Sequence, residues 1–406
     1  MAKIITDKEK IEELLTRGVE KIYPDKKSLA AALSAGKKLR LYCGYDPSAP
    51  ALHIGHAISL KKLGEFQALG HEVIFLIGDF TGMIGDPTDK SAARKKLSRE
   101  EVLANARQYA NQAKAYLRFQ GDNSALVKYN SEWQDRLTFR ELIEITSCFT
   151  VQQMIQRDMF QERLKAERPI FLHEFLYPVA QGYDSVAMDV DLEVGGNDQM
   201  FNMMCGRDLQ RAINNKEKFV LTMKLLADEK GAKMGKTEGN ALFLDVSPEN
   251  MYGVVMSWPD GILVPAMELC TNVAMAEVEK IREKLQNGQA NPRDIKMRLA
   301  REITAINHDQ EKAQTAEAHF VRTVQKKEVP EAIMNYELGI ANMKLIDLLV
   351  EIKFASSKTD ARRLIEQGGV KVGGEAIKDI NAAVDIPEAG VLIQKGKLKF
   401  LRVVRR

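Results

Sequence analysis

The chain is 406 residues long, which is more than one ordinary hydrophobic core holds and predicts two or three domains. The share of aliphatic residues is that of a globular protein. No apolar run approaches the length of a membrane span, which excludes an integral membrane protein built from helices. Lysine and arginine total 59 and aspartate and glutamate total 56, so the chain as a whole is nearly neutral.

The cysteines and the N-terminus indicate the cellular context. None of the four cysteines belongs to a C-x-x-C pair, which argues against a structural zinc site and fits a reducing compartment. Residues 1–7 lack the charged and then apolar pattern of an export leader. We therefore expect a cytoplasmic protein with no structural metal and no prosthetic group.

Helical and extended patterns alternate along the first half of the chain. A helix is predicted at about 8–17. Strands are predicted at 39–43, 73–78, 125–129, 189–194 and 219–226, separated by helical stretches. This alternation predicts an α/β fold with a doubly wound parallel sheet. Ligands of such sheets bind at the carboxyl ends of strands, where Gly44, Asp79 and Gly195 fall. No G-x-x-x-x-G-K is present, which disfavours a P-loop nucleotidase.

The motif His53-Ile54-Gly55-His56 follows the first predicted strand and the loop 44–48. Apolar residues then recur at helical spacing, so the motif opens a helix. The free N–H groups and the positive end of the helix dipole make such a start an anion site. Two imidazoles three residues apart can donate to phosphate oxygens, and Gly55 between them lets a flat group approach the backbone. Taken alone, both histidines could simply cap a surface helix.

A second cationic motif, Lys233-Met234-Gly235-Lys236-Thr237, begins 180 residues after His53. Glycines flank its two lysines, a composition suited to a loop that holds a polyphosphate. Taken alone the pair is a weak signal, because exposed lysines are ordinary surface residues. The motif follows an extended segment and precedes a helical region, as the first motif does.

Together the two motifs resemble the HIGH and KMSKS motifs of class I aminoacyl-tRNA synthetases. Four further segments, in family order, resemble the bacterial tyrosyl-tRNA synthetases: 42–47, 82–87, 177–184 and 195–199. The resemblance runs from about residue 35 to 240. A C-terminal stretch resembles the S4 RNA-binding domain that many bacterial members carry.

The resemblance implies a domain plan and an activity. It implies a Rossmann-like catalytic domain at 1–230, with an inserted segment at about 118–185 that forms the face of a homodimer. An α-helical domain on the anticodon side would follow at 231–335, and a small α+β S4 domain at 343–406. The implied activity joins L-tyrosine to tRNA(Tyr) through a tyrosyl-adenylate made from ATP. Mg²⁺ would arrive with ATP, so no dedicated metal ligands are expected.

Five polar residues fit the recognition of tyrosine. Asp86, Tyr177 and Gln181 offer an anion, a hydroxyl and an amide carbonyl to an ammonium group. Tyr177, Gln181 and Asp184 fall at i, i+4 and i+7, so one helix face can present all three. Asp184 can accept from the phenol and Tyr42 can donate to it. Phenylalanine would leave the buried Asp184 unpaired. Each residue could otherwise be a cap, a turn former or a surface residue.

The resemblance also assigns the ATP side of the site. His53 and Ser48 would hydrogen-bond the phosphates, and His56 and Gly55 would pack near the ribose. Four basic residues would clamp the departing pyrophosphate: Lys233, Lys236, Lys90 and Arg94. The remaining ATP contacts would be Gly44, Asp46, Gly196, Asp198 and Gln199.

The C-terminal tail is the basic part of the chain. Residues 343–406 hold 13 Lys or Arg and 8 Asp or Glu, a local charge of +5, which leaves about −2 for the rest of a chain that totals +3. Helices are predicted at 345–352 and 361–367, the second opened by a capping pattern at 357–360, and a hairpin at 370–377. A polar connection to the preceding domain is predicted at about 326–330. The residues expected to face RNA are Lys358, Arg362, Arg363 and Lys371. A salt-bridged helix surface is the simpler interpretation of the same side chains.

Three other interpretations remain open from the sequence. A tryptophanyl-tRNA synthetase shares the fold, but an indole pocket needs one acceptor and more room than Tyr42 and Asp184 leave. A non-catalytic RNA-binding protein would not need both intact motifs. A nucleotidylyltransferase of the same superfamily can share H-x-G-H, but it would not need Asp86, Gln181, Asp184 or an RNA-binding tail.

Overall fold

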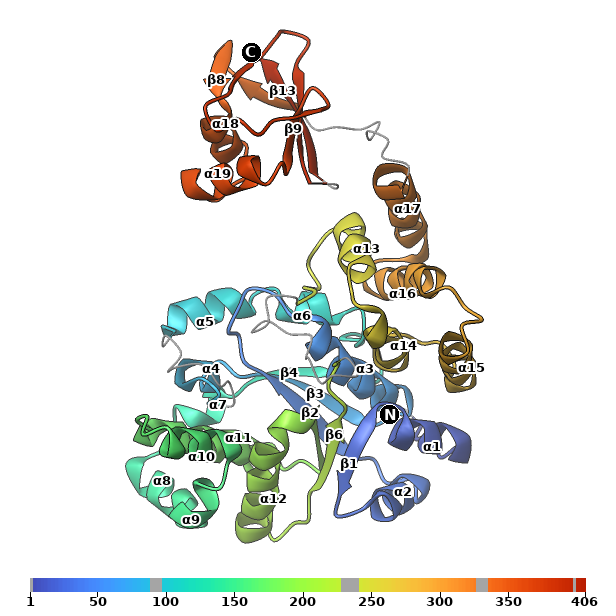
Figure 1. Cartoon of the computed structure of the whole chain (residues 1–406). Coiled ribbons are helices and arrows are strands. Elements are labelled where there is room, and N and C mark those ends of the chain that lie inside the picture. Colours follow the sequence, from blue (N-terminus) through green and yellow to red (C-terminus); the bar gives the residue numbers. More distant parts are fainter. Residues whose placement is uncertain (1–2, 88–96, 228–240, 326–334, 397–398) are drawn as a thin grey trace. The chain divides into compact units, whose positions relative to one another are not determined.

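The computed structural model describes residues 3–87, 97–227, 241–325, 335–396 and 399–406 (Figure 1). The chain divides into two compact units, Met1–Lys312 and Ala313–Arg406. The predicted polar connection at 326–330 lies outside the described residues.

A six-stranded sheet forms the centre of the first unit (Figure 1). Its strands are β1 (Val19–Tyr23), β2 (Arg40–Tyr45), β3 (Glu72–Ile77), β4 (Leu126–Tyr129), β5 (Leu192–Gly196) and β6 (Phe219–Met223). The spatial order is β1-β6-β5-β2-β3-β4. Neighbours from β6 through β4 are parallel, and β1 is antiparallel to β6. The predicted doubly wound parallel sheet is therefore confirmed.

The five predicted strands are present with shifted ends. The largest shifts are in β5, which begins three residues later than predicted, and in β6, which ends three residues earlier. Before β5, Asp189 adopts left-handed backbone, with φ of 47°, directly after a helix. The sequence does not predict β1, because this strand lies at the sheet edge and exposes Glu20 and Lys21. An exposed edge strand lacks the apolar alternation on which strand prediction depends.

Alternate residues of β2 face different helices. Helix α3 (Ile54–Ala68) packs on one face, where Tyr45 of β2 bonds Ser59 of the helix at 2.9 Å. Helix α11 (Leu176–Ala187) packs on the other face, where Tyr42 bonds Ser185 at 2.9 Å. Helix α12 (Met200–Asn214) packs against α11 and against β5 and β6. The period of two along a strand places Tyr42 and Tyr45 on opposite faces.

The direction of strand succession reverses between β2 and β5. From β2 the chain proceeds to β3 and β4 on one side, whereas β5 and β6 lie on the other. The described register between β2 and β5 comprises Leu41 with Leu192 and Tyr42 with Glu193, although both strands run further toward their carboxyl ends. A crevice at the carboxyl ends of strands at such a switch point is where open α/β sheets bind ligands.

Further helices of this unit surround the sheet (Figure 1). In the N-terminal part they are α1 (Lys8–Thr16), α2 (Lys26–Ser34), α4 (Thr81–Ile84), α5 (Arg99–Ala106) and α6 (Tyr109–Ala113). Between β4 and α11 they are α7 (Ser131–Gln134), α8 (Phe139–Thr146), α9 (Val151–Met154) and α10 (Asp158–Lys165). After β6 they are α13 (Pro248–Met256), α14 (Leu263–Cys270), α15 (Met275–Gln286) and α16 (Pro292–Asn307). Helix α17 (Gln310–Phe320) crosses the boundary between the units.

The C-terminal unit is α+β. Strands β9 (Val370–Val372), β10 (Glu375–Ala376), β12 (Val391–Lys395), β13 (Lys399–Arg405) and β7 (Asn335–Leu338) form a sheet in the order β10-β9-β12-β13-β7. Strands β8 (Asn342–Lys344) and β11 (Ala383–Asp385) form a second, two-stranded sheet. Helices α18 (Leu345–Glu351) and α19 (Lys358–Glu366) contribute to one apolar core with the strands.

The local predictions for this unit are largely confirmed. Strands β9 and β10 form the predicted hairpin. Helix α19 begins at Lys358, three residues earlier than predicted, because Ser357 itself is the N-cap and accepts from the Asp360 backbone N–H at 3.2 Å.

Candidate active site

Backbone hydrogen bonds join the first motif to the segment that follows the second. The Ile54 N–H donates to the Leu242 carbonyl at 2.8 Å, and the Leu244 N–H donates to the Leu52 carbonyl at 2.8 Å. A β-bridge pairs His53 with Phe243 between these two bonds. The chain therefore returns to the start of α3 directly after the residues that contain the second motif.

The lysines themselves, Lys233 and Lys236, lie outside the described residues, as do Lys90 and Arg94. The described chain reaches Ala227 before the first pair and resumes at 241. It reaches Pro87 before the second pair and resumes at Leu97.

His53 and His56 both cap helix α3. The Nδ1 of His53 accepts from the Gly55 N–H and the Nδ1 of His56 accepts from the His53 N–H, each at 3.1 Å. The two rings stack with their centroids 3.8 Å apart. A neutral imidazole whose Nδ1 accepts carries its proton on Nε2, so each ring is a donor on the side away from the backbone. Capping and phosphate donation therefore use different nitrogens, and the two interpretations of this motif are compatible.

The loop between β2 and α3 turns tightly at the carboxyl end of β2. The Ser48 N–H donates to the Asp46 carbonyl at 2.7 Å, and Ser48 is half-buried. Gly44 is exposed although it lies within an otherwise buried strand, so backbone faces solvent there. At the end of β5, a Cβ on Gly196 would lie 2.5 Å from Oδ1 of the exposed Asp198, so a larger residue there would displace this carboxylate.

Asp184 is a buried carboxylate that receives three side-chain hydrogen bonds. Its Oδ1 accepts from Trp133 Nε1 at 2.8 Å and from Gln134 Nε2 at 3.0 Å, and its Oδ2 accepts from Asn130 Nδ2 at 3.2 Å. The side chain is 2% exposed. Burial raises the pKa of Asp184 to about 7, and the three donors oppose that rise. Two acceptor sites on Oδ1 are filled by the described residues, which leaves a second acceptor site on Oδ2.

Tyr42 lies on the same face of the sheet as Asp184. Burial, and after it the charges of Glu193 and Asp184, raise the pKa of the Tyr42 phenol well above its ordinary value. Tyr42 is therefore a neutral hydroxyl, able to donate one hydrogen bond.

Helix α11 presents Tyr177, Gln181 and Asp184 on one face, as predicted. The Tyr177 hydroxyl donates to Asp46 Oδ2 at 2.7 Å, and Asp46 Oδ1 accepts from Thr81 Oγ1 at 2.6 Å. Gln181 Nε2 donates to Glu193 Oε1 at 3.1 Å. Because its nitrogen is used in this way, Gln181 has its carbonyl oxygen available as an acceptor.

Asp86 is held from two sides. Its Oδ2 accepts from Gln199 Nε2 at 2.7 Å, and its Oδ1 lies 3.7 Å from Arg157 Nη2. The Arg157 guanidinium lies over the Phe201 ring, 5.2 Å from its centroid. Asp86 also contributes to raising the pKa of Tyr177, after burial and Asp46, so these groups are neighbours.

Comparison with known proteins identifies the family. The family described as tRNA synthetases class I (W and Y) matches residues 34–325, and the tyrosine--tRNA ligase SYY-like C-terminal domain matches residues 323–403. The tyrosine--tRNA ligase of Thermotoga maritima is 42% identical over 400 residues, covering 98% of both chains. That of Moorella thermoacetica is 43% identical over 394 residues, covering 96% of this chain and 94% of its own.

The chain belongs to the tyrosine--tRNA ligase family. The match extends over nearly the full length of both relatives, so the C-terminal unit belongs to the family pattern as well.

Solved structures share the fold. A C-terminally truncated mitochondrial tyrosyl-tRNA synthetase of Coccidioides posadasii superimposes with a TM-score of 0.62 at 22% identity, covering 76% of this chain and 91% of that one. A tyrosyl-tRNA synthetase of Archaeoglobus fulgidus, complexed with L-tyrosine, gives 0.58 at 21% identity, covering 77% of this chain and 100% of that one.

The sequence analysis did not predict the residues that contact Asp184 and Asp86. Asn130, Trp133 and Gln134 all bond Asp184, and Arg157 pairs with Asp86. One signal was available for the first three, because they follow a predicted strand at its carboxyl end, where α/β sheets carry their sites. No comparable signal distinguishes Arg157 from the other arginines of the chain.

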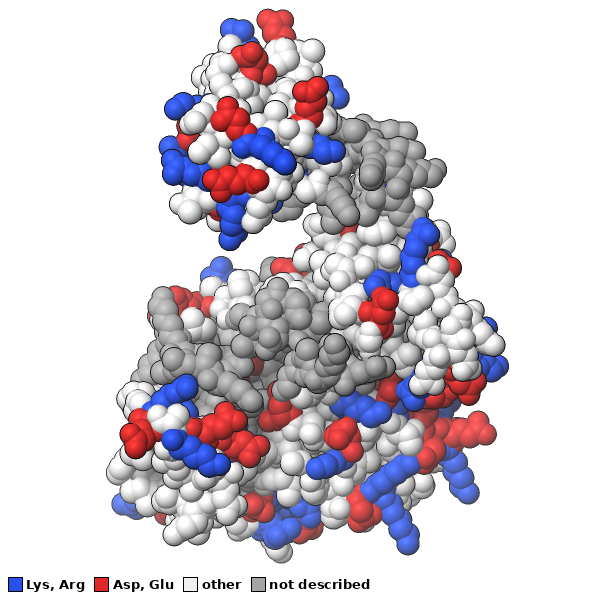
Figure 2. All heavy atoms as spheres, in the orientation of Figure 1, with Lys and Arg blue, Asp and Glu red and all other residues white. Residues whose placement is uncertain are grey.

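The four candidate RNA-binding residues are exposed on the C-terminal unit. Lys358 pairs with Asp347 at 2.8 Å and Arg363 with Asp360 at 2.9 Å, while Arg362 and Lys371 are exposed on α19 and β9. Figure 2 shows Lys and Arg interspersed with Asp and Glu on this unit. The salt-bridged interpretation thus describes two of the four side chains.

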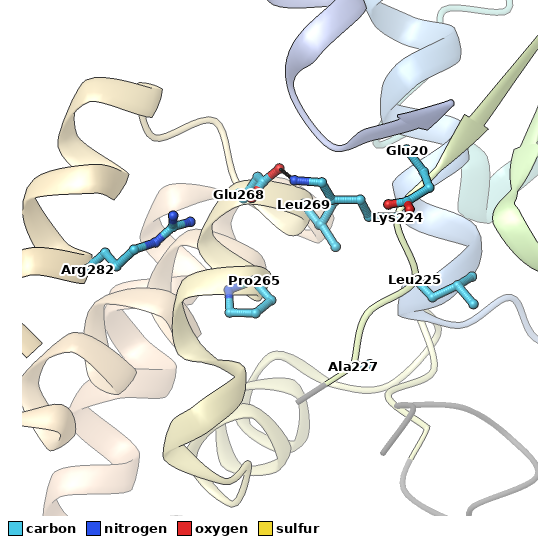
Figure 3. Close-up of a pocket in the computed structure, with 8 residues that line it drawn as sticks. All are labelled: Glu20, Lys224, Leu225, Ala227, Pro265, Glu268, Leu269 and Arg282. Carbon is cyan, nitrogen blue, oxygen red and sulfur yellow. Dashed lines mark hydrogen bonds and ion pairs between the residues drawn. The ribbon is translucent and has the colours of Figure 1, made fainter. Parts of the chain in front are cut away.

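A separate cavity of about 370 Å³ lies between the sheet and helices α14 and α15 (Figure 3). Lys224 Nζ is 2.8 Å from Glu268 Oε1, which also accepts from the Gly18 N–H at 3.1 Å. Its described lining includes no predicted site residue.

Across the described ranges, no helix is long and apolar enough to cross a membrane. Within the same ranges, no group of three or more His, Cys, Asp and Glu side chains is arranged to hold a metal ion.

Proposed function

We propose that the protein activates L-tyrosine with ATP to give tyrosyl-adenylate and pyrophosphate, then transfers the tyrosyl group to the 3′ end of tRNA(Tyr). The observations that carry this proposal are the joining of the first motif to the segment after the second, and the burial of Tyr42 and Asp184 on the α11 side of the same sheet. In this proposal a phosphate-binding helix start and the second cationic motif act together with a donor and an acceptor for a phenol. The names of the full-length relatives support the same assignment.

The amino acid is held at both ends in this proposal. Asp86, the Tyr177 oxygen and the Gln181 carbonyl receive the ammonium group, since each of them offers an acceptor. Asp184 receives the phenolic proton and Tyr42 donates to the phenolic oxygen. The pocket excludes phenylalanine because its ring would leave the buried Asp184 and Tyr42 unpaired. Tryptophan offers an indole N–H to Asp184 but no oxygen to Tyr42.

Adenylate formation then needs no protein nucleophile. The tyrosine carboxylate attacks the α-phosphorus, so the protein contributes positioning and stabilisation of charge. His53 and Ser48 donate to the phosphates, and His56 and Gly55 lie against the ribose. Gly44, Asp46, Gly196, Asp198 and Gln199 complete the ATP site. The departing pyrophosphate is bound by four basic residues: Lys233, Lys236, Lys90 and Arg94. Mg²⁺ arrives bound to ATP.

The second unit and the surface of the first suggest the partners. We assign RNA contact to the C-terminal unit through Lys358, Arg362, Arg363 and Lys371, and anticodon-side contact to the helices between 245 and 320. Eight of the eleven exposed large apolar side chains among the described residues fall between Leu126 and Leu172, inside the predicted inserted segment. Such a concentration supports a homodimer face there. All four cysteines are free thiols, which fits the cytoplasmic location that we propose.

The activity is tested by ATP–pyrophosphate exchange without tRNA, using tyrosine, phenylalanine and tryptophan in turn. We expect exchange with tyrosine alone, because only a phenol satisfies both Tyr42 and Asp184. His53→Ala is expected to slow the exchange by about 100-fold or more, since it removes a phosphate donor. Exchange with tryptophan would reassign the substrate, and no exchange at all would leave an RNA-binding protein.

Tyrosine binding should depend on pH through Asp184. The carboxyl pKa of about 7 means that much of the free protein holds a proton on Asp184 below that pH. The phenol donates only to the ionised form, so affinity should weaken as pH falls below 7, by up to about tenfold per pH unit. Equilibrium dialysis with tyrosine from pH 5.5 to 8 measures this. Asp184→Asn should lose the dependence, and a wild-type profile flat through pH 7 would contradict the assignment.

Removal of residues 335–406 should separate the two half-reactions. The cut lies before β7, so it removes a unit whose apolar core is internal. Tyrosine-dependent exchange should persist, while aminoacylation of tRNA(Tyr) falls. In the full chain, the double variant Arg362→Ala with Lys371→Ala should bind tRNA with a weaker salt dependence. The slope of the logarithm of the binding constant against the logarithm of the salt concentration should become shallower by about two. If the truncated protein retained exchange and aminoacylation to the same extent, the proposed RNA-binding role of this unit would be wrong.

The dimer face is tested by charge substitution. Phe139 is 78% exposed and Leu172 is 83% exposed, so Phe139→Asp with Leu172→Asp should leave the monomer folded. Sedimentation velocity should show a dimer for the wild type and a monomer for this double variant. Ile213→Asp, at a position 46% exposed on α12, is the matched control and should remain dimeric. A monomeric wild type would contradict the proposal.

A further inference from the structure

A chain of buried polar side chains runs behind the proposed phenol site. Tyr42 OH lies 2.9 Å from Ser185 Oγ, and Lys218 Nζ lies 2.8 Å from the same oxygen. Lys218 also contacts Glu193, which accepts from Gln181. Ser185 and Lys218 are fully buried and Tyr42 is 1% exposed. Neither Ser185 nor Lys218 is among the residues proposed above to touch a substrate.

The chemistry of these groups limits the direction of their hydrogen bonds. A lysine ammonium has three donors and no acceptor, so Ser185 Oγ must accept from Lys218. Burial lowers the pKa of Lys218, and the adjoining Glu193 carboxylate opposes that change. Ser185 then has one proton, and two acceptors lie within its reach, the Tyr42 oxygen at 2.9 Å and Glu193 Oε2 at 3.4 Å. The shorter contact favours donation to Tyr42.

The direction continues into the proposed substrate site. A Tyr42 hydroxyl that accepts from Ser185 keeps its own proton for another acceptor. The Glu193 carboxylate opposite Tyr42 is one such acceptor, and the phenolic oxygen of a bound tyrosine is another. The phenolic proton in turn goes to the remaining acceptor site on Asp184 Oδ2, because the described residues fill the two sites on Oδ1. The hydrogen bonds therefore run in a single direction, from Lys218 through Ser185, Tyr42 and the phenol to Asp184, which is the final acceptor.

We propose that Ser185 and Lys218 are positioning residues for amino-acid selection, which make Tyr42 a donor to the phenolic oxygen of the substrate. The proposal rests on the tyrosine-binding role of Tyr42 and Asp184 given above. It assigns to a buried Lys–Ser pair a share of the discrimination between tyrosine and phenylalanine. A pair that served only to stabilise the fold would affect both amino acids equally.

Helix α12 leaves space for this pair by carrying a glycine. A Cβ on Gly206 would lie 2.5 Å from Lys218 Nζ and 2.7 Å from Ser185 Oγ. Alanine is ordinarily favoured over glycine within a helix. At this position it would displace both polar atoms without removing any hydrogen-bonding group.

The test compares kcat/KM for tyrosine and phenylalanine in ATP–pyrophosphate exchange by the full chain. Ser185→Ala should lower the tyrosine-to-phenylalanine ratio by about 10-fold, the loss of one hydrogen bond, mostly through a higher KM for tyrosine. In a Tyr42→Phe background the same change should alter the ratio by less than about 2-fold, because the directed hydroxyl is already absent. Independent effects that multiply in the double variant would overturn the proposal.

Two further variants separate selection from stability. Ser59→Ala removes the other buried serine that bonds a β2 tyrosine at 2.9 Å, and it should leave the ratio unchanged. Gly206→Ala should lower the ratio as Ser185→Ala does. It replaces Ser185→Ala in the test if circular dichroism shows that Ser185→Ala does not fold. An unchanged ratio in Gly206→Ala or Ser185→Ala, with tyrosine-dependent exchange intact in the wild type, would refute the positioning role. Absence of exchange in the wild type would instead refute the proposed function.

Discussion

The arrangement of the site depends on the parallel pairing of β2 with β5. Their described register includes Tyr42 opposite Glu193, which puts a phenol and a carboxylate side by side on the face covered by α11. Both strands continue past this pair and end in glycine-containing segments, Gly44 on one and Gly196 on the other. Strand succession reverses here, and the carboxyl ends of strands at such a switch point are where open α/β sheets bind ligands. A one-residue slip of register would send Tyr42 to the face of α3.

Polar groups that are costly to bury lie on the α11 side of this strand pair. Asp184 needs three donors to be tolerated as a carboxylate, and even so its pKa is raised to about 7. The Lys218–Glu193 pair is almost wholly removed from water. Replacing such pairs with well-packed apolar residues is often neutral or stabilising, whereas losing one partner costs about 3–5 kcal/mol. Stability alone therefore gives little reason for their presence, and selection of a hydroxylated amino acid gives a direct one.

Backbone hydrogen bonds, rather than side chains, join the start of α3 to the segment that follows the second motif. Residues 52–54 pair with residues 242–244 through two N–H···O=C bonds and a β-bridge. Backbone pairing is insensitive to side-chain identity, so it fixes residues 242–244 whatever side chains the neighbouring residues carry. The histidines contribute twice, with Nδ1 closing the helix start and Nε2 carrying the proton.

The sequence by itself determined the parts of this protein that are local. Alternating patterns predicted the five parallel strands, and short motifs predicted the loop, the helix starts and the three side chains on α11. These predictions are correct because a strand, a helix cap or an i, i+4 contact depends on residues only a few positions apart in the sequence. The motif spacing also led to the correct family.

Only the tertiary structure decided which distant groups meet. The donors to Asp184 come from about fifty residues away, and the Lys218–Ser185 contact joins the residue before β6 to α11 across 33 residues. Hydrophobic periodicity likewise could not predict the edge strand β1 or the left-handed backbone at Asp189. These features follow from how sheet and helices pack, because a buried polar group is satisfied by whatever the fold brings within about 3 Å. No local pattern in the chain encodes that partner.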